Sequence, residues 1–248
     1  MASWIEAFRE PPHRCSYLPN ERASLDVRIA VDVSADEFGA ILARGWRRFG
    51  PSYFRPACVA CCACVPTRIQ VATYRASENQ KRARNQSAQL VRLVGAPIVD
   101  NERLEIYARW RSDRERKRSW DAAPMTADDY AMVFAFPHPS VREVTFRDPA
   151  RNDRLVGVGI VDEVPEALSA AYFFWDPEHA PPSLGTAHIV RLVDEAAQRG
   201  LSYIYLGYRV AGCPSLAYKG RFLPQQSLTG LPANDEEPQW VAASALTP

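Results

Sequence analysis

Four of the chain's six cysteines lie within seven residues, in the stretch CVACCACVP from Cys58 to Pro66. Cys58, Cys61 and Cys64 follow a Cys-x2-Cys-x2-Cys spacing, and Cys15 can add a fourth thiolate from upstream. Four thiolates form the ligand set of tetrahedral zinc sites and of iron–sulfur clusters. Free cysteine is also a common small buried residue. The spacing alone therefore leaves a metal site and a packed core both open.

A second candidate site is the segment YLGYRVAGCPSLAYKGRF, residues 205–222, which combines tyrosines with cations. Lys219 is one of only three lysines in a chain that otherwise uses arginine as its cation. An ammonium group there can stabilise a bound phosphate or a developing oxyanion. The alternative is structural, with the tyrosines packed in the core and Lys219 on the surface. Residue types alone leave both interpretations open.

A third candidate is the segment PPSLGT, residues 181–186, which opens a long predicted helix. The first N–H groups of a helix have no partner within it, and together with the helix dipole they bind anions. Ser183 equally suits the role of a plain helix cap. The Arg/Gln-x-x-Gly-x-Gly/Ala loop typical of acetyl-CoA enzymes is absent here, which argues against CoA as a donor. The sequence also lacks a P-loop, a dinucleotide fingerprint and a Gly-x-Ser-x-Gly motif.

Positive charge gathers in the first half of the chain, although the whole chain has a net charge of only +1. Residues 1–118 hold 21 Lys and Arg against 13 Asp and Glu, whereas the remainder holds 9 against 16. Residues 109–118 alone contain six cations and two anions. Such a surface suits a polyanion such as nucleic acid. It equally suits a solvated helix end that is stabilised by the helix dipole.

Capping patterns predict where several helices begin. Ser34 with Glu37, Ser77 with Gln80, and Thr126 with Asp129 each have the spacing of a capped helix start. Longer helices are expected over residues 101–120 and 183–200, the second ending at Gly200. Alternating and apolar runs predict strands over residues 53–56, 67–74, 90–94, 141–148, 154–164, 168–176 and 202–208.

This order of elements predicts an α/β fold. After about residue 100 it runs helix, helix, three antiparallel strands, helix and strand. That order is the skeleton of an N-acetyltransferase-like domain (GNAT- or FemX-like) on a mixed sheet, whose ligand meets the sheet after its fourth strand. We expect a smaller cysteine-containing α+β domain over residues 1–99, the transferase-like domain over 100–225, and a flexible tail over 226–248.

Composition indicates a globular protein of the cytoplasm. The 248 residues, 47% hydrophobic and 24% charged, are enough for one large or two small domains. No stretch approaches the ~20 apolar residues of a membrane span, and the start, MASWIEAFREPPHRC, lacks a secretory signal pattern. We therefore expect no membrane partner. In the cytoplasm, clustered cysteines favour metal or redox chemistry over disulfides.

Four motifs together carry a family resemblance. The stretches CSYLPNERA, RGWRRFGPSYFRPACVACCACVPTRI, SLGT and YLGYRVAGCPSLAYKGRFLP occur in one order from about Pro12 to Pro224. In this they resemble the aminoacyl-tRNA–protein transferases of the arginine and leucine N-degron branches, and most of all the bacterial aspartate/glutamate leucyltransferases. The resemblance spans nearly the whole chain, so it is far more specific than any single motif.

The resemblance implies that the protein moves an amino acid from charged tRNA to the N-terminal α-amine of another protein. In the bacterial members this amino acid is leucine and the acceptors begin with Asp or Glu, which marks them for degradation. The implied partners are aminoacyl-tRNA and proteins with acidic N-termini, not DNA. No cofactor is expected in the chemistry, although the resemblance implies an iron–sulfur cluster or zinc on the N-terminal cysteines, away from the transfer site.

The resemblance also assigns roles to matching residues. We expect Lys219, Tyr208 and Tyr172 to be catalytic, with Arg209 or Arg221 pairing with the acidic side chain of the acceptor. The full set of expected site residues is as follows: for substrate, Ser183, Leu184, Gly185, Thr186, Asp176, Tyr205, Arg209, Tyr218 and Arg221; for tRNA, Lys81, Arg82, Arg84, Arg114, Arg116 and Lys117; for metal, Cys15, Cys58, Cys61 and Cys64.

This sequence departs from the family pattern at several points. The Arg-His-x-x-Gly-Gly-Met-like stretch after the linker helix is replaced by RKRSWDAAPM, and the Tyr-Trp after Leu-Gly is Tyr208-Arg209. These changes leave donor and acceptor identity open, arginyl transfer included. Two other classes also stay open from the sequence, namely an acyl-CoA N-acyltransferase and a non-catalytic RNA-binding module.

Overall fold

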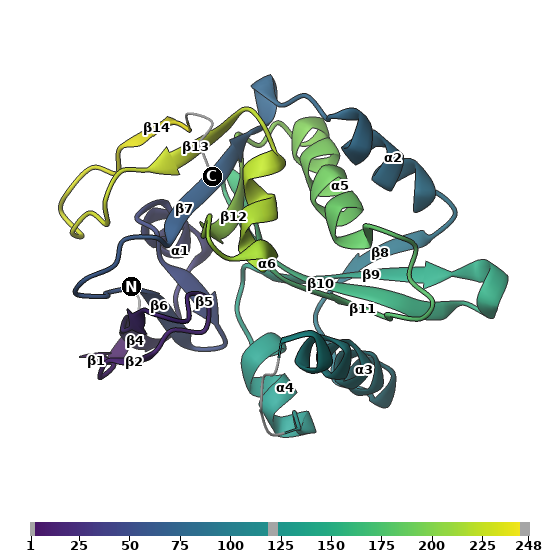
Figure 1. Cartoon of the computed structure of the whole chain (residues 1–248), viewed down its shortest axis with the longest axis horizontal. Coiled ribbons are helices and arrows are strands. Elements are labelled where there is room, and N and C mark those ends of the chain that lie inside the picture. The colour runs from purple at the N-terminus through teal and green to yellow at the C-terminus, as the bar shows by residue number, and fades with distance from the viewer. Residues whose placement is uncertain (1–2, 119–123, 244–248) are drawn as a thin grey trace.

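The computed structural model describes residues 3–118 and 124–243, and the side chains of residues 116–118 are not described. Its strands form three sheets, of which two are large (Figure 1). The smaller of these is antiparallel, with strand order β1-β4-β6-β5. Its strands are β1 (Ser3–Arg9), β4 (Leu25–Val31), β6 (Ser52–Pro56) and β5 (Arg47–Phe49), and a two-stranded ribbon of β2 (His13–Arg14) and β3 (Arg22–Ala23) lies near the N-terminus.

Helix α1 (Ala35–Ala43) completes the N-terminal part. Ser34 and Glu37 form the predicted capping box, and Gly45 follows the helix with a φ of +86°. Trp46 and Tyr53 form a buried cluster with Tyr205, which belongs to the larger sheet. Since one hydrophobic cluster spans both sheets, the two parts of the chain share a core.

The larger sheet has eight strands in the order β14-β13-β7-β12-β11-β10-β9-β8. Most neighbours are antiparallel, and β11 and β12 are parallel, so the expected mixed sheet is confirmed. Its strands are β14 (Trp240–Ala242), β13 (Gln225–Leu228), β7 (Val65–Gln70), β12 (Tyr203–Arg209), β11 (Ala167–Trp175), β10 (Arg154–Val164), β9 (Val141–Asp148) and β8 (Val91–Gly95).

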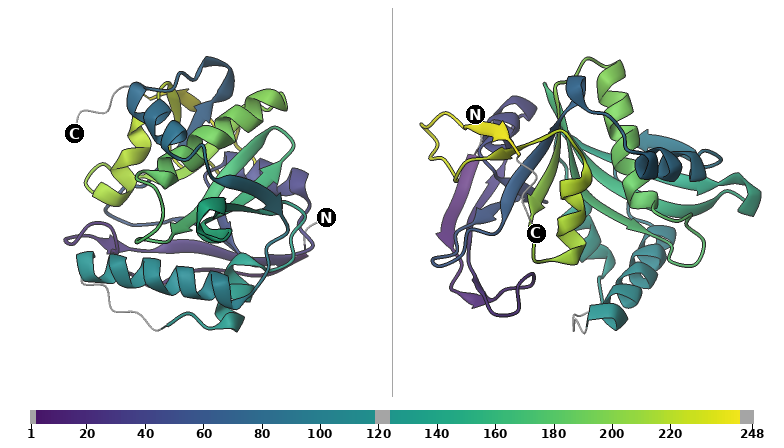
Figure 2. Two further views of the ribbon diagram at one scale, coloured as in Figure 1. Left: turned by 90° about the vertical axis from the view of Figure 1, so that its right-hand side faces the viewer. Right: turned by 45° about the horizontal axis from the view of Figure 1, so that its top comes forward.

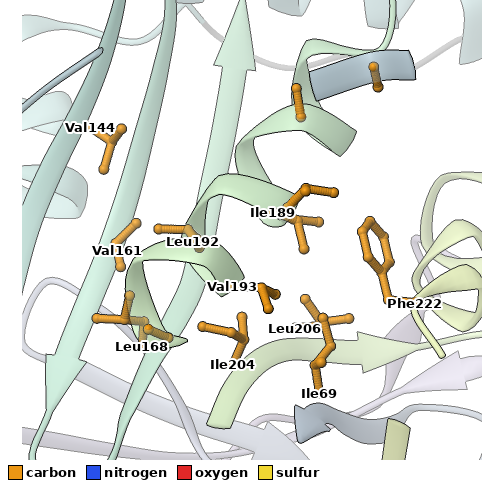
Figure 3. Packing of buried hydrophobic residues seen from close by; sticks show 14 of the residues in the cluster. Ile69, Val144, Val161, Leu168, Ile189, Leu192, Val193, Ile204, Leu206 and Phe222 are labelled. Atoms are coloured by element: carbon orange, nitrogen blue, oxygen red, sulfur yellow. The ribbon is translucent and has the colours of Figure 1, made fainter. Parts of the chain in front are cut away.

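Helices cover both faces of this sheet (Figures 1 and 2). On one face lie α5 (Leu184–Gln198) and α2 (Glu78–Gln86), and on the other lie α3 (Asn101–Arg118) and α4 (Ala127–Phe134). Figure 3 shows the core under α5, where Ile189 and Val193 face Leu206 and Phe222. The short segments are η1 (Val71–Thr73), η2 (Pro149–Arg151), α6 (Pro214–Ala217) and η3 (Tyr218–Arg221). Among the described residues, no helix is long and apolar enough to cross a bilayer.

The change from one sheet to the other does not fall at residue 100, where sequence placed a domain boundary. Strands β7 and β8 precede that residue and yet belong to the larger sheet. The expectation of a flexible tail over residues 226–248 is wrong for β13 and β14. There Ser227 pairs with Thr67, Leu228 is buried, and the ring of Trp240 lies 4.3 Å from the Arg68 guanidinium. A few buried anchors hold this segment against β7 despite its polar composition.

Candidate active site

The larger sheet opens between its two parallel strands. Strands β11 and β12 pair only over Ala167–Ser169 and Tyr203–Tyr205, although both continue beyond this point. Residues 170–173, on the far part of β11, are half-buried rather than buried. Backbone groups that lose their strand partner must find another one in protein, solvent or ligand. The opening is therefore the place in the sheet where a substrate can meet the backbone.

Lys219 sits beside this opening because α6 and η3 fold back over β12. Gly207 has a φ of +79°, and a Cβ at this residue would lie 3.3 Å from Nζ of Lys219. Within the described part of the chain, the Lys219 ammonium forms no salt bridge. Burial, together with the nearby charge of Arg47, lowers the pKa of Lys219 to about 7. At neutral pH this amine can therefore both hold and release a proton.

Arg47 approaches the same point from strand β5. Its side chain is 7% exposed, and its Nη1 donates to the carbonyl oxygens of Leu42 and Trp46. Its guanidinium lies 5.6 Å from the ring of Tyr205 and 5.4 Å from the ring of Tyr208. Sequence reasoning did not single out Arg47. The only available signal was its place in the motif GWRRFG, since burial of a cation is not visible in sequence.

The two tyrosines of β12 form the wall behind Arg47. The Tyr208 hydroxyl donates to the carbonyl oxygen of Gly45 at 2.8 Å, and the Tyr205 hydroxyl accepts from Nη1 of Arg68 at 3.2 Å. Burial raises the pKa of both hydroxyls. Because the Tyr208 hydroxyl is already bound to the backbone, the geometry favours a positioning role for Tyr208 over proton transfer.

Tyr172 lies on β11 within an aromatic cluster under α3. Its ring centroid is 5.7 Å from that of Trp110 and 5.0 Å from that of Phe134. Arg114 lies over the rings of Trp110 and Trp175, at 5.3 and 4.9 Å. Burial raises the pKa of Tyr218, and the charge of Arg114 partly offsets this rise. This aromatic and cationic wall connects α3 with η3 across the opening.

The start of α5 has uncapped backbone donors, as expected for an anion site. Ser183 adopts a left-handed conformation with a φ of +60°, and its side chain makes no capping hydrogen bond. Leu184 is buried, whereas Gly185 and Thr186 are half-buried. The first-turn N–H groups therefore have no side-chain cap from Ser183.

Asp176, which was expected to bind substrate, is fully buried just after β11. It accepts from Nη2 of Arg109 at 3.3 Å, from Nη2 of Arg154 at 3.1 Å and from the backbone N–H of Glu178. Burial raises its pKa, but these donors and His179 outweigh that effect, so the pKa lies below the usual range. Asp176, Glu178 and His179 are close enough to hold a cation, but the two guanidiniums already neutralise Asp176. The geometry favours a structural role at the end of β11.

The two arginines expected to recognise the acceptor differ in exposure. Arg221 is exposed at the end of η3. Arg209 is half-buried, and its Nε would lie 2.7 Å from a Cβ on Gly220. Neither approaches Gly207 as Arg47 and Lys219 do.

The cysteines lie closer to Lys219 than expected. Charges on Cys15, Cys58, Cys61 and Cys213 all act to raise the pKa of Cys64, which burial brings to about 12. Cys64 and Cys213 also act on Lys219, because Cys64 precedes β7 and Cys213 follows its partner β12. Cys64 and Cys213 thus lie near Lys219 and not in a remote domain.

The expected metal site is not preformed. Zinc–sulfur bonds of about 2.3 Å require the thiolates to converge on one point. Over the residues that the structure describes, no three cysteine sulfurs lie within 4.8 Å of one another. The arrangement does not fit a bound metal without rearrangement. Metal analysis and an absorption spectrum of anaerobically purified protein test the prediction.

The expected tRNA-binding cations do not share one surface. Helix α2, with Arg82, and helix α3, with Arg114, lie on opposite faces of the larger sheet (Figure 1). On α2, Lys81 pairs with Glu78 at 2.8 Å and Arg84 faces Asp194 at 3.3 Å. Arg116 and Lys117 belong to α3, and their side chains lie outside the described residues. The larger sheet therefore separates the cations of α2 from those of α3.

The fold and site define an α/β protein with an amine-bearing opening at a mixed sheet, and comparison with known proteins gives its family. Residues 13–82 match the N-terminal part, and residues 102–229 the C-terminal part, of arginine-tRNA-protein transferases. The chain belongs to the arginine-tRNA-protein transferase family, and it is an aminoacyltransferase.

Relatives named aspartate/glutamate leucyltransferase match most of the chain. The protein of Marinobacter nauticus is 35% identical over 89% of this chain and 92% of its own length. That of Helicobacter hepaticus is 30% identical over 91% of this chain and 93% of its own length. Among solved structures, FemX matches 82% of this chain and 79% of its own with 8% identity and a TM-score of 0.43. L-PGS from Bacillus licheniformis matches with a TM-score of 0.44 over 59% of this chain and 47% of its own, with 11% identity.

Proposed function

We propose that this aminoacyltransferase moves leucine from charged tRNA to the α-amine of proteins that begin with Asp or Glu, and so marks them for degradation. The observation that carries the proposal is Lys219, a half-buried amine with a pKa of about 7 beside an opening in the sheet. The names of the relatives support leucine and acidic acceptors. Charged tRNA as the donor supports a cytoplasmic location.

The aminoacyl ester is already activated, so positioning and proton transfer suffice. In our mechanism the acceptor α-ammonium, with a pKa near ~8, gives one proton to the neutral amine of Lys219. The freed nitrogen attacks the ester carbonyl carbon, and the first-turn N–H groups of α5 hold the oxyanion. As the C–O bond to the ribose breaks, the ribose oxygen takes the second amine proton. A peptide bond and a free tRNA 3′ hydroxyl result, and Lys219 returns its proton to solvent.

The surroundings of Tyr172 support leucine over arginine as the transferred residue. The rings near it are apolar, and the arginine charges that act on its hydroxyl are those of Arg111 and Arg114. A third guanidinium, carried by an arginyl donor, would be repelled there. We propose that the leucine side chain lies against this aromatic wall.

We propose that tRNA approaches over α3 rather than over α2. Arg114 borders the opening from α3, whereas Lys81 and Arg84 lie on α2, on the other face of the larger sheet. Phosphate contacts release counterions, so the affinity for tRNA falls steeply with salt. Arg114→Gln should flatten that dependence more than Arg84→Gln.

A matrix of donors and acceptors tests the function. Purified protein is incubated with leucyl-, arginyl- or phenylalanyl-tRNA and with peptides that differ only in their first residue. Transfer from leucyl-tRNA to Asp and Glu peptides is expected. If transfer from arginyl-tRNA is preferred, the transferred amino acid is arginine and not leucine. If the peptide is acylated by acyl-CoA without tRNA, the proposed function is wrong.

A further inference from the structure

Arg47 has two buried donors without a partner. Its Nη1 donates to backbone carbonyls, but within the described residues Nε and Nη2 are buried and donate to no hydrogen-bond partner. A buried donor left unsatisfied is costly, and native proteins rarely keep one without a reason. Nε and Nη2 lie side by side on a guanidinium and form the fork that binds a carboxylate through two parallel hydrogen bonds.

Gly207 lets the side chains of Arg47 and Lys219 lie close to the backbone of β12. A Cβ at this residue would lie 3.7 Å from Nε of Arg47 and 3.3 Å from Nζ of Lys219. Two cations therefore border one position that carries no side chain. Within the described residues neither cation has a carboxylate within salt-bridge distance, since Asp162 nearby pairs with Arg48. A guanidinium beside an amine that readily gains a proton, with no acid close by, is expected where an anion binds.

We propose that Arg47 reads the side-chain carboxylate of the acceptor's first residue in front of Gly207, next to Lys219. This assignment rests on the proposed function and replaces Arg209 and Arg221 as the readers. In an N-terminal Asp or Glu, the carboxylate and the α-amine belong to one residue. Binding the carboxylate at Arg47 therefore delivers the amine to Lys219, so recognition and proton transfer share one pocket.

A tRNA phosphate is the other anion that such a pair can bind. Nε and Nη2 form a side-on fork, and the rings of Tyr205 and Tyr208 lie close to the guanidinium. This arrangement favours the planar carboxylate of a peptide side chain over a phosphate. Two measurements distinguish the sources. A carboxylate reader controls the choice between Asp and Asn, whereas a phosphate contact controls the affinity for tRNA equally with every acceptor.

The test compares kcat/KM for peptides that begin with Asp and with its neutral isostere Asn. This ratio does not depend on the fraction of active enzyme. In Arg47→Gln it should fall by at least about tenfold, with unchanged affinity for leucyl-tRNA. Arg47→Lys keeps a charge that can still donate to Leu42 and Trp46 but lacks the fork, so an intermediate ratio is expected. If Arg47→Gln fails to fold, the ratio measured for Arg47→Lys decides the test.

Arg55→Gln is the matched control. Arg55 is a half-buried arginine of the neighbouring strand β6, 4.8 Å from the ring of Trp46, and its loss should leave the ratio unchanged. The assignment is overturned if Arg47→Lys has the same Asp/Asn ratio as the wild type. It is also overturned if the ratio collapses in Arg209→Gln or Arg221→Gln. Loss of tRNA affinity in Arg47→Gln would instead assign the pocket to phosphate. If the wild-type protein transfers leucine and these variants keep the ratio, only the assignment fails, and not the proposed function.

Discussion

Replacing Lys219 separates a proton-accepting role from that of a fixed charge. In Lys219→Met the amine is lost, and transfer should slow by about 10²–10⁴, the usual contribution of general base catalysis. Lys219→Arg should be equally slow, because a guanidinium keeps its proton at every accessible pH. A lysine that only stabilised the oxyanion or a phosphate would tolerate arginine. The assay is single-turnover transfer of labelled leucine to a peptide that begins with Asp.

Lys219→Met should also gain stability, and the size of the gain follows from the pKa of Lys219 in the folded protein. A fall in the pKa of Lys219 from 10.5 to about 7 costs up to about 4 kcal/mol at pH 7, at 1.36 kcal/mol for each tenfold change in affinity for the proton. Because solvent reaches part of the side chain, we expect about 2 kcal/mol. Lys219→Met removes this cost, so it should be more stable than the wild type at neutral pH.

The direction of the pH dependence follows from proton binding. Between pH 7 and 10.5 the unfolded chain holds the Lys219 proton and the folded chain releases it, so wild-type stability should rise with pH in this window. Lys219→Met should lose that rise. Urea unfolding at pH 7 and pH 9.5 measures both. Full activity of Lys219→Arg, or equal stability of Lys219→Met and the wild type at pH 7, would refute the assigned role and its depressed pKa.

Three further predictions concern the scaffold. Burial lowers the pKa of His138 and of His188 to about 3, so both resist protonation when folded. Stability should therefore fall as pH drops from 6.5 towards 3, by up to about 1.4 kcal/mol per pH unit for each histidine, and His188→Leu should reduce that slope in urea titrations. Gly159→Ala places a Cβ 2.6 Å from the His188 ring and should cost about 1–3 kcal/mol by calorimetry. Trp240→Ala uncovers Arg68 and should cost about 1–2 kcal/mol, measured as a lower Tm; an unchanged Tm would contradict the described tail.

Local signals were sufficient for the elements that are stabilised locally. The capping boxes at Ser34 and Ser77 are confirmed because each depends on residues only three positions apart. The predicted strand over 67–74 starts earlier, at Val65, and gives way to a 3₁₀ turn after Gln70, where pairing with β12 ends. Strand ends are set by partners, and these are distant in sequence.

The site required information that the sequence does not carry locally. Family motifs brought Lys219 and Tyr208 into consideration, but only tertiary packing shows that the Tyr208 hydroxyl binds a backbone carbonyl. Arg47 became recognisable only through its burial and its two unpartnered donors. Likewise, a charge count cannot place α2 and α3 on opposite faces of a sheet, since that depends on the order of its strands.

Mass spectrometry of the transfer product identifies both the residue that is transferred and the amine that receives it. Purified protein, leucyl-tRNA and a peptide that begins with Asp and contains an internal lysine are incubated, and the product is fragmented. The proposed mechanism predicts one leucine in peptide linkage to the α-amine of Asp, and much less of this product from the Asn peptide after the same incubation time. Leucine on the lysine side chain, or no transfer from any charged tRNA, would contradict it.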